Sequence, residues 1–147
     1  MIRIYYPQHP FKIKEEGAGL EYIFDELRRQ WVRLTPEEWV RQNFAQYLVQ
    51  VKRYPPSYIA VERRMKLGAL NKRFDLLVFN SGAKPWMMIE CKAQEVVLDK
   101  SVIWQILHYH LAIPVPYLVI TNGDQCLAYK KGTMDFESIP VLPGYDQ

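Results

Sequence analysis

Three consecutive runs of strand-type residues, joined by short turns, are the feature of this 147-residue sequence that most restricts its fold. The runs are SYIAVERRMKL (57–67), RFDLLVFN (73–80) and WMMIECKA (86–93). The segments between them, GALNK and SGAKP, are typical of turns. Because connections this short join neighbouring antiparallel strands, the three runs predict a β-meander.

A helix with clear start signals precedes these runs. Thr35 is its N-cap, Pro36 is its first helical residue, and Glu37 and Glu38 lie in the first turn, where the helix dipole favours acids. Glu38 also completes a T-x-x-E capping box, and YPP at 54–56 ends the helix.

A second helix and a closing hairpin follow the runs. The helix is predicted over 99–112, with Asp99 or Ser101 as its N-cap and Pro114 after its end. Two further strands, joined by an Asn-Gly turn signal, are predicted at 117–121 and 125–131. The order is therefore α-β-β-β-α-β-β. A strand–helix–strand unit needs a crossover connection, so we expect an α/β (α+β) fold with a mixed sheet flanked by helices.

The N-terminal part of the sequence and its tail carry weaker signals. IRIYY at 2–6 predicts a short strand, and apolar residues at helical spacing in 20–31 predict a further helix. No repeat or flexible linker divides the sequence. We therefore expect one domain over 1–147, with an N-terminal extension (1–19) and an irregular tail (133–147).

The sequence lacks the usual signals for export or membrane insertion. No apolar run approaches the roughly 18 residues that span a bilayer, and the polar, aromatic N-terminus is unlike a signal peptide. Cys91 and Cys126 lie far apart, which favours two reduced thiols in the core. A P-loop motif is absent. We expect a cytoplasmic protein that has no membrane partner and binds no ATP.

Charge is distributed unevenly along the chain. Residues 1–73 contain 14 Lys/Arg and 8 Asp/Glu, a balance of +6, whereas residues 74–147 contain 5 and 8, a balance of −3. A basic surface beside an acidic one suits a polyanion that is steered toward a metal site. The alternative is an ordinary solvated strand edge with polar loops.

Charged residues interrupt the apolar second and third runs. If their hairpin pairs Phe79 with Trp86, Asp75 lies opposite Glu90, with Cβ atoms about 4.5–5.5 Å apart. Because side chains alternate along a strand, Glu90 and Lys92 leave the same face, with Asp75 beside them. This register thus predicts that two carboxylates and one ammonium group converge.

Two explanations of this cluster are open. Adjacent carboxylates repel unless a cation lies between them, and hard oxygen ligands suit Mg²⁺ or Mn²⁺. Lys92 would then orient or deprotonate a water molecule, or neutralise charge in the transition state. The alternative is a structural ion triplet at a sheet edge, which would contribute little to stability. The apolar flanks of Asp75 and Glu90 do not suit a solvated edge.

The spacing of these residues also resembles a known family. Asp75, fourteen residues and then Glu90-Cys91-Lys92 resemble the PD-(D/E)XK nuclease superfamily, although Phe74 replaces the proline before the aspartate. Further blocks fall in order, namely LTPEEWVRQ (34–42), RFDLLVF (73–79), MIECKA (88–93), Q-x-x-x-Y at Gln105 and Tyr109, and VITNGDQCLAY (119–129). Over about residues 20–131, they resemble the N-terminal nuclease domain of type I restriction enzyme R (motor) subunits, as a stand-alone chain.

The resemblance implies a restriction-endonuclease-like core and Mg²⁺-dependent cleavage of DNA by activated water, in restriction, defence or repair. The other reading is a non-cleaving DNA-binding or assembly module that works with a motor or specificity partner. The partners implied are DNA, a second copy of the chain in a homodimer, and a separate motor or specificity protein.

The resemblance also assigns roles to individual residues. Asp75 and Glu90 would bind the metal with the Cys91 backbone carbonyl as a candidate third ligand, and Lys92 would be the catalytic lysine. Glu37 would complete the acidic cluster because it shares the inward stripe of its helix, and Glu38 is the alternative. The residues expected to contact DNA, or to support those that do, are Gln105, Tyr109, Arg63 and Arg73.

Overall fold

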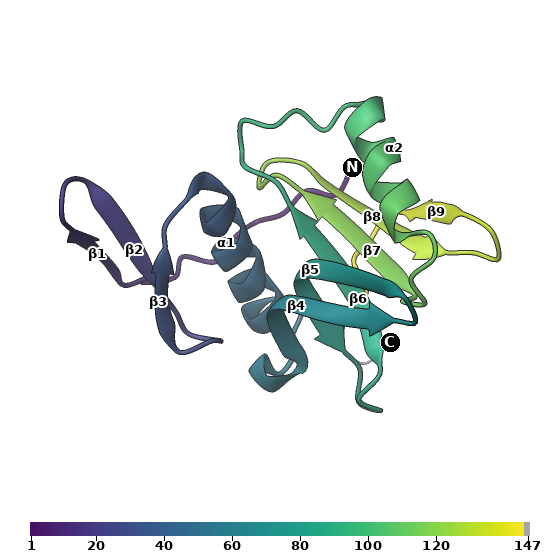
Figure 1. Cartoon of the computed structure of the whole chain (residues 1–147), viewed down its shortest axis with the longest axis horizontal. Helices are drawn as coiled ribbons and strands as arrows, with labels where there is room; N and C mark the ends of the chain where they lie inside the picture. The colour runs from purple at the N-terminus through teal and green to yellow at the C-terminus, as the bar shows by residue number, and fades with distance from the viewer. Residues whose placement is uncertain (146–147) are drawn as a thin grey trace.

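The computed structural model of the chain describes residues 1–145, apart from the side chains of Leu67 and Leu70 (Figure 1). In chain order, its elements are β1 (Ile13–Glu16), β2 (Leu20–Asp25), β3 (Gln30–Arg33), α1 (Pro36–Gln50), the 3₁₀ turn η1 (Pro56–Tyr58), β4 (Ile59–Leu67), β5 (Leu70–Phe79), β6 (Pro85–Cys91), α2 (Lys100–His110), β7 (Tyr117–Thr121), β8 (Cys126–Lys131) and β9 (Phe136–Ile139). None of its helices is long and apolar enough to cross a membrane.

Six strands form the main sheet, in the order β4-β5-β6-β7-β8-β9. β6 and β7 are parallel, and all other neighbours in this sheet are antiparallel. The helix α2 lies in the crossover between the two parallel strands. The predicted order of elements from α1 to β8 and the mixed sheet are confirmed, and the architecture is compatible with a restriction-endonuclease-like fold.

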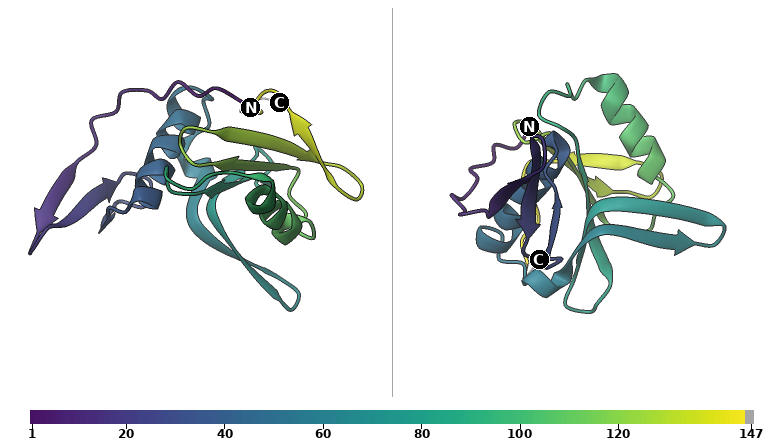
Figure 2. Two further views of the ribbon diagram at one scale, coloured as in Figure 1. Left: turned by 90° about the horizontal axis from the view of Figure 1, so that it is seen from above. Right: turned by 60° about the vertical axis from the view of Figure 1, so that its left-hand side comes forward.

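The two helices cover opposite faces of the main sheet (Figure 2). Along β5, Leu76 and Val78 belong to the core cluster that contains Phe44 of α1, whereas Leu77 belongs to the cluster that contains Ile106 of α2. Because successive residues of a strand point to opposite faces, a strand covered on both sides needs a continuous apolar run. This explains the near-unbroken apolar character of the second and third predicted strands.

Both predicted helices form, and their caps can be assigned. Thr35 Oγ1 accepts a hydrogen bond from the Glu38 N–H at 3.1 Å, as predicted. The Glu38 carboxylate, however, accepts hydrogen bonds from other side chains, so the capping box is made only on its Thr35 side among the described residues. For α2, Asp99 Oδ1 accepts from the Val102 N–H at 2.9 Å, which identifies Asp99 as the cap.

The prediction of a helix over residues 20–31 is wrong. This segment forms β2 and the start of β3, which pair in an antiparallel hairpin. Its apolar residues suit strand alternation as well as a helix, since Ile23 is buried on one side while Phe24 and Trp31 pair across the strands, with ring centroids 5.4 Å apart. Arg29 adopts a left-handed conformation (φ 54°) in the turn, which a helix would not allow.

Residues 2–6 form no strand in the described structure, so that prediction is also wrong. The Ile2 N–H donates to the Cys126 carbonyl at 2.9 Å, and Ile2, Ile4 and Tyr6 pack against the core. The alternating apolar residues of this segment therefore fill the edge of the core, although the segment itself does not join a sheet.

The tail is more regular than predicted. β9 lies within the range expected to be irregular, where it pairs with β8. Leu142 is buried, and the carbonyl of Pro143 accepts a hydrogen bond from Tyr54 Oη at 2.8 Å, so the chain beyond β9 packs against the body. Residues 146 and 147 of the predicted tail lie outside the described part of the chain.

The register of β5 and β6 is the structural basis of the candidate site. Leu76 pairs with Ile89, and Val78 pairs with Met87, as predicted. The predicted pair of Phe79 and Trp86 is wrong, because a bulge after Val78 shifts Phe79 onto Pro85. The bulge lies at the turn end of the hairpin, so it leaves the register toward Asp75 and Glu90 unchanged.

Two smaller β structures extend away from the main sheet. β1, β2 and β3 form a separate three-stranded sheet beside α1 (Figure 1). The outer halves of β4 and β5 project as a two-stranded ribbon on the other side of the site, next to α2 (Figure 2).

Candidate active site

Asp75 is held from two directions at the junction of β5 and β6. Its Oδ2 accepts a hydrogen bond from the Cys91 N–H at 2.7 Å, and its Oδ1 accepts one from Arg41 Nη2 at 3.1 Å. Only 13% of its side chain is exposed. Both oxygens thus have defined positions, and the carboxylate cannot rotate without breaking a charge-assisted hydrogen bond.

Glu90 and Lys92 lie beside Asp75. Lys92 Nζ is 3.6 Å from Glu90 Oε1, and 21% of the Glu90 side chain is exposed. Burial, followed by the negative charge of Asp75, raises the pKa of Glu90 to about 7, although Lys92 acts in the opposite direction. The three charged side chains therefore converge as the register argument predicts, and the two carboxylates are close enough to disfavour ionisation of one of them.

These residues open into a cleft of about 420 Å³. The cleft is lined by Glu37, Arg73, Asp75, Glu90, Lys92, Gln105, Ile106, Tyr109 and His110. Gln105 and Tyr109 reach it from α2, where their i, i+4 spacing places them on one face. Arg73 also contributes to the lining, whereas Arg63 lies outside it on the projecting ribbon.

Glu37 and Glu38 occupy different environments at the start of α1. Glu37 lines the cleft, and 48% of its side chain is exposed. Glu38 is only 7% exposed and is not among the residues that line the cleft; it contacts Arg28 and Arg41. Glu37 was expected on the inward side of its helix, but Glu38 is the buried residue of the two. Glu37 is nevertheless the one that lines the cleft with Asp75 and Glu90.

Arg41 is an important part of the site that sequence reasoning missed. Its side chain is 5% exposed and contacts four carboxylates, those of Glu37 (3.4 Å), Glu38 (2.9 Å), Glu62 (2.7 Å) and Asp75 (3.1 Å). Burial alone would lower the pKa of Arg41, but the negative charges of Glu38, Asp75 and Glu62 raise it. The sequence did contain a signal for these contacts, because Arg41 follows Glu38 by three residues and Glu37 by four, which places all three on one side of a helix.

Glu62 is the second residue that sequence reasoning missed. In the register of β4 and β5 it falls opposite Asp75, between the pairs Val61–Leu76 and Arg63–Phe74. Its backbone is left-handed (φ 51°), which costs about 1–2 kcal/mol for a residue with a side chain. Burial alone would raise the pKa of Glu62, but Arg41 and other cations lower it. Its sequence signal was weak, a single acid in a basic strand.

Arg28 connects this cluster with the separate N-terminal sheet. Its Nε donates to Asp25 at the end of β2, and its Nη2 lies 3.1 Å from Glu38 Oε1. Glu38 in turn contacts Arg41, which contacts Asp75. Alternating charges therefore run without a break from the β2–β3 hairpin to the candidate site.

The oxygen donors beside Lys92 suit a hard divalent cation. Asp75 and Glu90 supply carboxylates, and the Cys91 carbonyl lies on the β5 side of its strand because its N–H does. Within residues 1–145, no group of three or more His, Cys, Asp or Glu side chains is arranged around one point. A cation at this position would take two carboxylates from the protein and complete its shell with a backbone oxygen and water, as Mg²⁺ commonly does.

The fold and cleft together define a class, that of mixed α/β proteins whose architecture is compatible with a restriction-endonuclease-like fold. The family model of the type I restriction enzyme R protein N-terminus matches residues 36–143. The chain belongs to this family, and the membership indicates a restriction-related function. No curated protein matches the sequence. The match begins with α1, so β1, β2 and β3 lie outside it, and residues 20–35 of the predicted resemblance are not covered.

Proposed function

We propose that the protein is a metal-dependent nuclease that hydrolyses phosphodiester bonds of DNA. The observation that carries this proposal is the convergence of Asp75, Glu90 and Lys92 in one cleft, with a raised pKa at Glu90. Two repelling carboxylates beside a lysine are costly in a mainly buried position, and a divalent cation would remove that cost. Membership in a family of restriction enzyme subunits supports the same conclusion.

Each residue has a distinct part in this proposal. Asp75 and Glu90 would hold Mg²⁺ or Mn²⁺, and the bound cation would supply Lewis-acid chemistry that lowers the pKa of water and neutralises phosphate charge. Lys92 would donate hydrogen bonds to the scissile phosphate or orient the attacking water. Glu37 lines the same cleft and would accept a hydrogen bond from water there.

The far wall of the cleft would hold the substrate. Gln105 and Tyr109 face the charged cluster from α2 and can donate hydrogen bonds to phosphate oxygens on either side of the scissile bond. Arg73 lies at the root of the ribbon and offers a guanidinium group at the rim. This wall would orient the phosphodiester for in-line attack.

The test compares cleavage of plasmid and linear DNA in Mg²⁺ or Mn²⁺ by the wild type, Asp75→Asn, Lys92→Gln and the surface control Lys84→Gln. The control site is exposed in the turn between β5 and β6. We expect the first two variants to lose activity by about two orders of magnitude or more while the control retains it. Cleavage that survives both site substitutions would place the reaction elsewhere.

A second function is favoured by the hydrogen bonds of Asp75. Both of its oxygens already have protein partners, Arg41 and Cys91, so the site is partly charge-balanced without a cation. A DNA-binding or assembly module that cooperates with a motor or specificity protein, or with a second copy of the chain, would need no more than this. DNA binding without cleavage in either metal would favour this function.

A further inference from the structure

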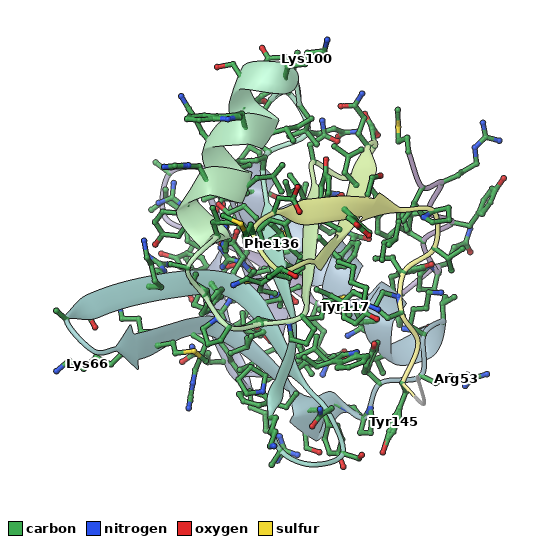
Figure 3. All side chains as sticks on the ribbon, turned by 90° about the vertical axis from the view of Figure 1, so that its right-hand side faces the viewer. Arg53, Lys66, Lys100, Tyr117, Phe136 and Tyr145 are labelled. Carbon is green, nitrogen blue, oxygen red and sulfur yellow. The ribbon has the colours of Figure 1, made fainter. Side chains whose placement is uncertain are left out.

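The outer part of the β4–β5 hairpin is the most basic segment of the chain. Residues 63–73 contain five Lys/Arg and no Asp/Glu. Arg64 pairs directly with Arg73 across the two strands, an arrangement of like charges that destabilises an isolated hairpin. Figure 3 shows this ribbon projecting beyond the body, with Lys66 near its end.

The cations of the ribbon fall into two groups. Those at its root have partners, since Arg73 Nη2 lies 3.1 Å from Glu62 Oε1 and Lys72 Nζ lies 3.8 Å from the Tyr109 ring centroid. Arg63, Arg64 and Lys66 are exposed, and the described part of the chain provides no acidic partner for them. The root contacts therefore fix the ribbon against the site and α2, while the outer cations remain available to an external anion.

The ribbon begins at the candidate site itself. Leu76 and Val78 face α1, but Phe74 belongs to the cluster on the α2 side. Regular alternation would put all three on one face, so it breaks at Asp75, opposite the left-handed Glu62. This break turns the ribbon out of the sheet at the level of Asp75 (Figure 2).

We propose that this ribbon binds the phosphate backbone of duplex DNA beside the bond to be cleaved. A two-stranded ribbon fits the major groove of B-DNA, which is about 12 Å wide. The six residues from Asp75 to the tip span about 20 Å. Measured along the helix axis of the duplex, this length corresponds to about six phosphates of one strand at about 3.4 Å each. The inference takes its substrate class from the proposed function, but it concerns a binding site that lies outside the cleft.

The test measures binding of a duplex of about 30 base pairs, longer than the ribbon's reach, in EDTA between about 50 and 200 mM salt. The ribbon variant is R63Q/R64Q/K66Q. The control R53Q/K84Q/K130Q removes the same charge from exposed positions outside the ribbon, and Figure 3 shows Arg53 on the opposite side from Lys66. The magnitude of the slope of log K against log salt should fall by about 2–3 for the ribbon variant and by less than about 1 for the control.

Two further outcomes separate this inference from the proposed function. If the ribbon variant and the control change the salt slope of duplex binding as expected, but the wild type never cleaves DNA, the ribbon inference stands and the nuclease proposal fails. If cleavage depends on Lys92 but both triple variants change the slope equally, the nuclease proposal stands and the ribbon inference is overturned. The ribbon inference would also be overturned if R63Q/R64Q/K66Q lost as much affinity for single-stranded DNA of the same sequence as for the duplex. The ribbon would then not be specific for duplex DNA.

Discussion

Replacing Glu90 with glutamine should stabilise the metal-free protein at alkaline pH. Burial and the charge of Asp75 raise the pKa of Glu90 from 4.5 to about 7 in the folded state. A raised carboxyl pKa means that the folded state prefers the protonated form, so its contribution is fully present below pH 4.5 and is lost as the pH rises through about 7. Glutamine imitates the protonated form at every pH.

The structure limits the size of this effect. Each pKa unit corresponds to about 1.4 kcal/mol, so the change from 4.5 to about 7 gives an upper bound of about 3.5 kcal/mol. Water reaches the exposed fifth of the side chain, and Lys92 lies 3.6 Å away. We therefore expect about 1–2 kcal/mol of stabilisation above pH 8.

Urea unfolding in EDTA, at about pH 4 and about pH 8.5, measures the difference directly. Glu90→Gln should match the wild type at the lower pH and exceed it at the higher pH. Added Mn²⁺ should then stabilise the wild type by binding its folded state, but it should stabilise the variant much less. Glu137→Gln, at an exposed position on β9, is the matched control.

A variant that loses stability equally at both pH values would refute this reasoning. It would mean that the ionised carboxylate of Glu90 is satisfied by its surroundings without a cation. Repulsion between the two carboxylates across β5 and β6 would then no longer support a metal site. The same would follow if the control changed the pH dependence as much as Glu90→Gln does.

The remaining predictions concern α1. Arg41→Gln should lower the free energy of unfolding by about 3–5 kcal/mol, since it leaves four carboxylates without their shared cation; a loss below about 1 kcal/mol in chemical denaturation would contradict the network. Glu38→Gln should destabilise by about 3 kcal/mol, whereas Glu37→Gln should change stability by less than about 0.5 kcal/mol but reduce cleavage; the reverse pattern in paired denaturation and nuclease assays would assign the site to Glu38. Thr35→Ala should cost about 1 kcal/mol in thermal or urea unfolding through loss of the N-cap, with Thr133→Ala as an exposed control, and an unchanged midpoint would argue against the cap.

The central part of the fold was predictable because its signals are local and agree with one another. Caps at Thr35 and Asp99 fix where the helices begin, and short turns fix which strands are neighbours. The apolar runs around Asp75 and Glu90 then determine the register, because a shift by one residue would place charges in both cores. The bulge at Phe79 altered the turn without altering this constraint.

The errors have a common physical origin. In residues 20–31 the apolar spacing suits both a helix and a hairpin, and the choice is made by contacts across the chain, such as Arg28 with Glu38. Arg41 and Glu62 are 21 positions apart, so their contact depends on the packing of α1 against β4. No local sequence pattern predicts a contact between residues this far apart in the chain. β9 was missed for the same reason, since pairing with β8 defines it.

The Arg41 cluster is more than a source of stability. A buried arginine among carboxylates is often no more stabilising than apolar residues of similar volume, because desolvation offsets the Coulomb attraction. The strained backbone of Glu62 adds a further cost at the same place. The cluster instead helps to fix the orientation of the Asp75 carboxylate, because Arg41 from α1 and the Cys91 N–H from β6 each donate a hydrogen bond to one of its two oxygens. Under the proposed function Asp75 would share a cation with Glu90, which requires its position to be defined to about 0.5 Å. Contacts from two separate elements supply that definition in the protein alone.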